Sequence, residues 1–369
     1  MQRAPRRSLV AVLTVVAVLV GVAACGDSIV SPSPSAPATA TPSATSTATT
    51  SLGPTATPRD TVRWSRLLFD EVSPESREMG SWTADSSGSV AYLFGGRGAD
   101  GALGDLWAYD LAADRWLRLA PDGPAPAPRS GHVAAWIDGL GLVILGGRSD
   151  AGALDDMWIY DPDADGWRTQ TWTGDAPAAR WGSCSAVASD GWLWISHGTA
   201  GDATLLDDTW RYDPVQSSWG RLESGTGGPA ARAGAACWWT DDDRFVLFGG
   251  QTADTAAVGD LWALPSAGGD WVGVESVAGT ERVDAAVGRT AAAGVAFGGT
   301  SPSGTTLGDT VVVDARTLAM SLLDSTGDAR PTARRGAVLV DDPGNERMLL
   351  FGGWDGSVLR EDVWSLDLP

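Results

Sequence analysis

Short apolar runs that end in two glycines recur along the chain. "AYLFGG" (residues 91–96), "LVILGG" (142–147), "FVLFGG" (245–250) and "MLLFGG" (348–353) have the length and ending of buried strands. The segments that follow them alternate, so Trp107 and Tyr109 share one face of a strand, as do Trp158 and Tyr160. No part of residues 61–369 has a sustained helical period. The pattern therefore predicts four short strands in each period.

The period covers the whole of this region. Tryptophans nine residues apart frame a turn-like segment four times, at Trp107/Trp116, Trp158/Trp167, Trp210/Trp219 and Trp262/Trp271. A glycine doublet comes twelve or thirteen residues before each pair, and the doublets recur every 49 to 54 residues. The six doublets are Gly95-Gly96, Gly146-Gly147, His197-Gly198, Gly249-Gly250, Gly298-Gly299 and Gly352-Gly353. A period of this length indicates blades or solenoid units.

The two ends of the region predict how the repeats close. After the sixth doublet the chain supplies "EDVWSLDLP", which has no strand for a second tryptophan. At the other end "TVRWSRLLF" supplies Trp64 before the first doublet. We expect Trp64 to fill the fourth-strand position of the last blade, because a closed ring leaves only short, protected strand edges.

With these motifs, residues 61–369 resemble the Kelch-repeat β-propellers. The resemblance implies an all-β fold, a six-bladed β-propeller of four-stranded antiparallel blades whose last blade is closed by the N-terminal strand. Two blades depart from the pattern. In blade 5, Val311 and Met320 stand where the tryptophans would be, and in blade 3, His197 replaces a doublet glycine.

The first 60 residues have the composition of an export signal and a tether. Residues 1–24 carry three arginines before a mostly apolar run, the layout of a signal peptide. "VAAC", which ends at Cys25, resembles the lipobox of bacterial lipoproteins, whose cysteine is acylated. Residues 25–60 are rich in Ser, Thr, Pro and Ala and are expected to be disordered. We therefore expect a lipid-anchored, extracytoplasmic protein of the cell envelope; an uncleaved anchor or an ordinary secretory signal is the alternative.

Charge restricts the partners. The formal net charge is −20, or −23 after removal of the signal peptide, and every basic residue is an arginine. Such acidity argues against binding to nucleic acid or to anionic lipid headgroups. The absence of lysine excludes Schiff-base catalysis by a lysine of this chain.

Cysteine and histidine are too sparse for the common metal sites. Cys184 and Cys237 lie four and five residues after the arginines of their repeats, so we expect them on opposite faces of equivalent strands, as buried free thiols. His132 and His197 are the two histidines, and packing roles are predicted for both. We expect no metal and no cofactor. The galactose oxidases, which the Kelch propellers resemble in fold, use a copper site that needs histidines this chain lacks.

Two charged residues occur in all six repeats. An arginine precedes each doublet, and an aspartate stands two residues before each tryptophan position. A ligand site is seldom sixfold symmetric, so we interpret both sets as scaffold that hydrogen-bonds between blades or to turn backbone. The sets are Arg77, Arg129, Arg180, Arg232, Arg282 and Arg334, with Asp105, Asp156, Asp208, Asp260, Asp309 and Asp362.

Residues that vary between blades can carry specificity. The residue after each doublet and the entry to each first strand lie on one face in this fold, which we call the doublet-loop face. Some Kelch propellers grip acidic or polar peptides with arginines of this face, a pattern that Arg97 and Arg148 fit; ordinary exposed loop arginines are the equal alternative. The predicted ligand-binding residues are Arg97, Arg148, Gln251, Trp354, Arg335 and Trp181.

Short loops and the missing catalytic sets favour recognition over chemistry. The sequence thus predicts a monomeric propeller that binds a protein or glycan partner. One alternative is a sugar-modifying enzyme that resembles the Kelch sialate epimerases, with Glu78, Glu281, Asp284 and Arg282 as acid–base candidates. Another is a purely structural envelope component.

Overall fold

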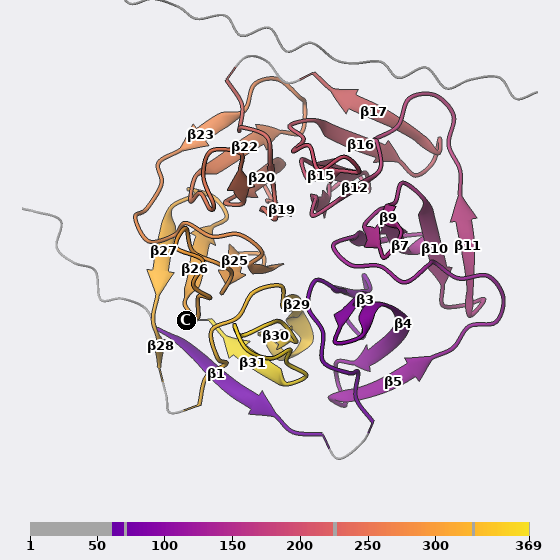
Figure 1. The fold of residues 1–369 in the computed structure, drawn as a ribbon, viewed down its shortest axis with the longest axis horizontal. Coiled ribbons are helices and arrows are strands. Elements are labelled where there is room, and N and C mark those ends of the chain that lie inside the picture. The colour runs from indigo at the N-terminus through magenta and orange to yellow at the C-terminus, as the bar shows by residue number, and fades with distance from the viewer. Residues whose placement is uncertain (1–60, 70–71, 224–226, 327–328, 369) are drawn as a thin grey trace, which may run out of the picture. The chain divides into compact units, whose positions relative to one another are not determined.

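The computed structural model describes residues 61–69, 72–223, 227–326 and 329–368. These residues belong to one compact unit, residues 56–369. Its longer strands form six sheets, five of four strands and one of five, arranged in a ring around a central axis in chain order (Figure 1). The expected signal peptide, Cys25 and tether lie outside the described residues. Within the described ranges, no helix has the length and apolar character needed to cross a membrane.

Each of the first three blades is a four-stranded antiparallel sheet. Blade 1 contains β2 (Ser81–Ala84), β3 (Val90–Gly98), β4 (Gly101–Asp110) and β5 (Arg115–Leu119). Blade 2 contains β6 (Val133–Ile137), β7 (Gly141–Leu145), β10 (Met157–Asp161) and β11 (Gly166–Gln170). Blade 3 contains β13 (Cys184–Val187), β14 (Leu193–Ser196), β16 (Thr209–Asp213) and β17 (Ser218–Leu222).

The last three blades follow the same plan. Blade 4 contains β19 (Ala236–Trp239), β20 (Arg244–Phe248), β22 (Leu261–Pro265) and β23 (Val272–Val274). Blade 5 contains β24 (Ala286–Arg289), β25 (Ala293–Phe297), β26 (Thr310–Asp314) and β27 (Met320–Leu323). Blade 6 contains β29 (Val338–Asp342), β30 (Arg347–Phe351), β31 (Val363–Asp367) and β1 (Val62–Leu67).

Short elements complete the loops. A 3₁₀ turn, η1 (Pro343–Asn345), connects β29 to β30. Three two-stranded ladders extend blades 2 to 4 beyond their doublets. They are β8 (Arg148–Ser149) with β9 (Gly152–Ala153), β12 (Arg180–Trp181) with β15 (Thr199–Ala200), and β18 (Arg232–Ala233) with β21 (Gln251–Thr252).

The N-terminal strand closes the ring. β1 runs antiparallel to β31, and Trp64 is opposite Leu366 in this register. On its other side β1 pairs in parallel with β28 (Ser325–Thr326), so both edges of β1 are hydrogen-bonded. The predicted six-bladed propeller and its closure by the strand of Trp64 are confirmed.

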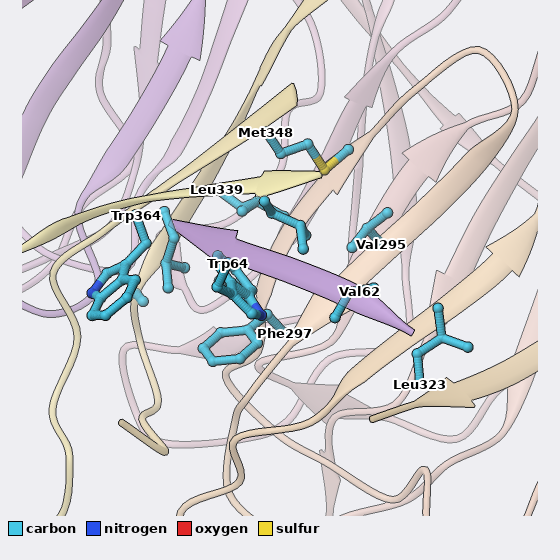
Figure 2. Packing of buried hydrophobic residues seen from close by; sticks show 12 residues of the cluster. Val62, Trp64, Val295, Phe297, Leu323, Leu339, Met348 and Trp364 are labelled. Carbon is cyan, nitrogen blue, oxygen red and sulfur yellow. The ribbon is translucent and has the colours of Figure 1, made fainter. Parts of the chain in front are cut away.

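The core lies between neighbouring blades. Val62 and Trp64 on β1 pack in one apolar cluster with Phe297 of blade 5, and the ring centroids of Trp64 and Phe297 are 4.8 Å apart (Figure 2). Trp64 is 3% exposed and Val62 is fully buried. Each blade therefore packs one face against the preceding blade and the other face against the next. Burial of these apolar faces stabilises the ring.

Blade 5 lacks its tryptophans, and a residue of blade 4 fills part of the space. The Trp238 indole, on β19, lies directly on Gly294 of β25. Any side chain at position 294 would collide with the indole ring. Trp238 shares its apolar cluster with Val311, which is fully buried at the vacant tryptophan position. The substitution in blade 5 is thus compensated by its neighbour.

The prediction of free thiols is wrong: Cys184 and Cys237 form a disulfide, with Cα atoms 5.3 Å apart. Cys184 lies on β13 and Cys237 on β19, the inner strands of blades 3 and 4. The two residues do point to opposite faces of equivalent strands, as expected. However, adjacent blades in a ring stack front to back, so opposite faces of equivalent strands meet between the blades.

Candidate functional site

The glycine doublets connect each blade to the next. Both doublet residues are left-handed in every blade, for example Gly95 (φ 58°) and Gly96 (φ 108°), and His197 adopts φ 60° in blade 3. The second glycine donates a backbone hydrogen bond to the carbonyl of the next blade's repeat arginine, as Gly96 does to Arg129 at 2.8 Å. The sixth such bond, from Gly353 to Arg77, closes the circle at 2.7 Å.

The six repeat arginines are scaffold, as predicted. Each is at most 4% exposed, donates Nη1 to the first doublet carbonyl and forms an ion pair with the aspartate of its own blade. Their side chains thus bond within a blade, while the backbone carries the bonds between blades. The pairs are Arg77–Asp105, Arg129–Asp156, Arg180–Asp208, Arg232–Asp260, Arg282–Asp309 and Arg334–Asp362.

Five of these aspartates accept a third hydrogen bond from the tryptophan two residues later, such as Trp262 Nε1 to Asp260 at 2.7 Å. Burial alone would raise the pKa of Asp260, but the hydrogen bonds from Arg232 and Trp262 outweigh it and hold the pKa below its usual value. In blade 5, Val311 has no side-chain N–H to donate. The Arg282–Asp309 contacts there lengthen to 3.3 and 3.4 Å.

Both histidines are buried beside the doublets. His132 Nε2 lies 2.8 Å from Ser81 Oγ of blade 1, and His197 Nδ1 lies 2.6 Å from Ser196 Oγ. Burial lowers the pKa of each to about 3, so both are neutral at physiological pH. His132 is therefore bonded to a serine of the neighbouring blade rather than to Ser130.

The doublet-loop face is built by backbone pairing within each blade. In each blade, the residue after the doublet pairs with the residue after the repeat arginine. In blade 1, for example, the backbones of Arg97 and Glu78 exchange hydrogen bonds of 2.8 and 3.0 Å. The six pairs are Glu78/Arg97, Ser130/Arg148, Trp181/Thr199, Ala233/Gln251, Val283/Thr300 and Arg335/Trp354. All six predicted binding residues thus belong to this face. Their role in binding stays a prediction.

Two arginine–tryptophan contacts stand out on this face. The Arg335 guanidinium carbon is 4.7 Å from the Trp354 ring centroid, and that of Arg148 is 5.6 Å from Trp181 of the next blade. Both distances are within the range of cation–π attraction. Arg335 also forms an ion pair with Glu78 at 3.3 Å.

Arg97 and Gln251 are exposed, and their side chains take part in neither of these two contacts. The nearest acidic partner of Arg97 is Asp150, at 3.9 Å, and both side chains are more than half exposed. An exposed pair at this distance contributes little to stability. The face therefore presents guanidinium groups on blades 6, 1 and 2, with indoles on blades 6 and 3.

A closed ring of backbone hydrogen bonds surrounds the axis at this face. In each blade, the backbone N–H of the residue two positions after the repeat arginine donates to the carbonyl of the equivalent residue in the preceding blade. The N···O distances are 2.6 to 2.9 Å. All six residues have a left-handed backbone, with φ from 56° to 65°. They are Met79, Gly131, Gly182, Gly234, Asp284 and Gly336.

An axial cavity of about 160 Å³ lies on this hydrogen-bonded ring, lined by the six ring residues and the residue after each. Asp284 is the acidic residue of its lining. Of the other acid–base candidates, Arg282 is bound to Asp309, and Glu281 accepts a hydrogen bond from the Gly279 N–H of its own turn. Glu78 forms an ion pair with Arg335, so Asp284 is the one of the four candidates that lines the cavity.

The sequence alone suggests Asp284 only as a catalytic candidate and does not reveal the hydrogen-bonded ring. The sequence does mark the ring position, because four of the six repeats read Arg-x-Gly there. Met79 and Asp284 replace the glycine in the other two. At a left-handed position glycine is the default, so a side chain there is a departure with a conformational cost.

A larger hollow, of about 540 Å³, lies among the turns at the other end of blades 4 and 5. It is lined by Asp241, Asp242 and Asp314, among others. Asp241 and Asp242 already pair with Arg289 and Arg244. Two of the three carboxylates of this hollow are therefore already paired, and its larger volume does not by itself make it the binding site.

Comparison with known families gives a match over more than half of the chain. Residues 56–250 match the model of the KLHDC2/KLHL20/DRC7 Kelch-repeats domain. The match includes the first three blades and the doublet of the fourth.

Curated proteins that contain similar sequence are much longer. The Arabidopsis thaliana serine/threonine-protein phosphatase BSL2 is 28% identical over 54% of this chain and 19% of its own length. Acyl-CoA-binding domain-containing protein 4 of the same plant is 30% identical over 52% of this chain and 29% of its own length. Human multiple epidermal growth factor-like domains protein 8 is 34% identical over 30% of this chain and 4% of its own length. The chain thus covers less than a third of each of these relatives.

Proposed function

The chain belongs to the Kelch-repeat family, and from this premise we propose that it is a binding module that recognises an acidic segment of a partner protein through its doublet-loop face. A Kelch propeller is a scaffold typical of protein-interaction modules. The observation that carries the proposal is the break in sixfold symmetry, which gathers Arg97, Arg148 and Arg335 with two indoles on neighbouring blades. Guanidinium groups suit carboxylates, and indoles are enriched at interfaces.

The test starts from intact cells. Crosslinking with the full chain as bait identifies the partner, and binding is then measured with purified proteins. Arg97→Ala with Arg148→Ala should weaken binding at least about tenfold, because charge-assisted hydrogen bonds contribute roughly 1.5–3 kcal/mol. Arg115→Ala with Arg118→Ala removes the same charge from exposed positions of β5 and should leave binding unchanged. Equal affinities of the two double variants would assign binding to another face, and capture of a glycan instead would replace the protein partner.

We also propose a location on the extracytoplasmic side of a membrane, through a lipid on Cys25. The disulfide between Cys184 and Cys237 supports an oxidising compartment, because stable disulfides are rare in the cytosol. Cys25→Ser should move the protein from the membrane fraction to the soluble fraction. Retention of the variant in membranes would contradict lipid anchoring at this residue.

A further inference from the structure

Asp284 is the charged member of the hydrogen-bonded axial ring. Its carboxylate extends over Gly234 of the preceding blade, where a side chain in place of glycine would collide with Asp284 Oδ1. No described residue donates a hydrogen bond to this carboxylate. Asp284 is partly exposed and lines the axial cavity, so its carboxylate is left to pair with solvent or with a ligand there.

The charges around Asp284 leave its carboxylate short of a counter-ion. Burial raises the pKa of Asp284 to about 6; Arg335 acts against the rise and Glu78 adds to it. Arg335 forms an ion pair with Glu78 and lies against Trp354, so its charge is already shared. A cation that enters the cavity would supply the missing charge.

The cavity is small and has a mixed lining, which includes the side chains of Met79, His132 and Ser183 besides Asp284. A Cβ atom placed on Gly131 would lie 3.6 Å from Met79 Cε and 3.7 Å from Trp181 Cε3, so a thioether and an indole border the space above this glycine. The cavity volume is about 160 Å³. The cavity therefore has room for one end group of a partner, whereas whole small-molecule ligands occupy roughly 300–1,000 Å³.

We propose that the axial cavity binds a primary ammonium group of the partner, with the Asp284 carboxylate as its counter-ion and Met79 against its alkyl stem. This inference rests on the proposed function, because the cavity opens within the doublet-loop face. The ammonium group is either a lysine side chain or a free chain N-terminus. The chain itself contains no lysine, so no lysine of its own competes for the site.

Binding should depend on pH in one direction. An ionised carboxylate is required, so affinity is present above about pH 6 and falls as the pH drops through that value. The other charged groups that face Asp284 are Glu78 and Arg335. His132 also lines the cavity, but with a pKa of about 3 it stays neutral over this range.

The experiment titrates the full chain with small probes by calorimetry at pH 7.5. Nα-acetyl-lysine amide represents a lysine side chain, and alanine amide represents a free N-terminus. The same compounds with the amine acetylated are the uncharged controls. We expect one ammonium probe to bind and its acetylated form not to bind; the probe that binds identifies the source of the group.

Two variants remove the counter-ion without straining the backbone. Asp284→Asn keeps the shape and tolerates a left-handed backbone, and Asp284→Gly restores the glycine of the other repeats. Each should weaken the bound probe about 10- to 100-fold, the loss of a charge-assisted hydrogen bond. Asp341→Asn is the matched control, because burial also raises the pKa of Asp341 to about 6 but this residue does not line the cavity.

The outcomes separate this inference from the proposed function. If neither ammonium probe binds, or if both Asp284 variants bind it as wild type does, the ammonium site is wrong. If the probe binds as expected while Arg97→Ala with Arg148→Ala still binds the partner, the cavity site stands and the assignment of the arginines fails.

Discussion

The Arg–Asp pairs show at single residues how one lost donor weakens a repeated contact. In blade 4, Asp260 accepts from Arg232 at 2.6 Å and from the Trp262 indole at 2.7 Å. In blade 5, valine replaces that indole and the closest Arg282–Asp309 contact is 3.3 Å. The buried arginines are otherwise equivalent, so the two blades form a natural comparison.

We predict that Asp260→Asn lowers the free energy of unfolding by about 3–5 kcal/mol, because it leaves the buried Arg232 charge without its counter-ion. Asp309→Asn should cost clearly less, about 1–3 kcal/mol, since the interaction it removes is already long. Urea denaturation of the full chain with each change measures both values. Equal losses would show that the indole and the shorter distance add nothing.

We predict that the contribution of Asp341 to the stability of the fold depends on pH. Burial raises its pKa to about 6, with Arg289 acting against the rise and Asp342 adding to it. A carboxyl group whose pKa is higher in the folded state favours folding at low pH and loses that contribution as the pH rises through about 6. Asp341→Asn removes this titration, so its melting temperature relative to wild type should increase from pH 4 to pH 7. A constant difference over this range would contradict the prediction.

At the scale of elements, the inner strands of adjacent blades contact each other front to back. β13 and β19 are joined in this way by the Cys184–Cys237 disulfide, which links residues 53 positions apart. The bond connects two sheets that share no hydrogen-bonded strand pair. It therefore adds a covalent link between blades that are otherwise joined by packing and by hydrogen bonds.

Reduction should raise the intact mass by two daltons, and disulfide loss should lower the free energy of unfolding by about 2–4 kcal/mol. Cys184→Ala with Cys237→Ala is the control for effects of the reductant, and it should be as unstable as the reduced wild type. An unchanged mass after complete reduction of the unfolded chain would show that the thiols are free.

At the scale of the whole molecule, stability depends on closure of the ring by β1. This strand carries Trp64 into the core between blades 5 and 6, and it pairs with β31 on one side and β28 on the other. Without it, blade 6 would expose an unpaired strand edge, which is a site for aggregation.

Trp64→Ala should therefore cost about 3–5 kcal/mol, the loss expected for truncation of a buried aromatic side chain. Leu68→Ala, one residue past the end of β1 and 81% exposed, is the matched control and should change stability by less than about 0.5 kcal/mol. Thermal and urea unfolding measure both variants. If Trp64→Ala were as stable as the control, closure by β1 would not contribute to the fold.

Much of this propeller could be predicted from local sequence. The glycine doublets, the tryptophan spacing and the repeat arginines determined the number of blades, the four strands in each and the scaffold role of the charged sets. These features repeat because every blade has the same internal geometry, and a left-handed doublet or an alternating strand is determined by residues close together in the chain.

What lies between blades was decided only by the tertiary structure. The Cys184–Cys237 bond depends on which faces of two blades meet. The convergence of Met79, His132 and Asp284 on the axis depends on the ring, which brings distant repeats together. Strand periodicity describes one sheet and carries no information on how sheets stack. For that reason the sequence by itself determined the repeated scaffold, while the asymmetric cavity that distinguishes this protein required the closed ring.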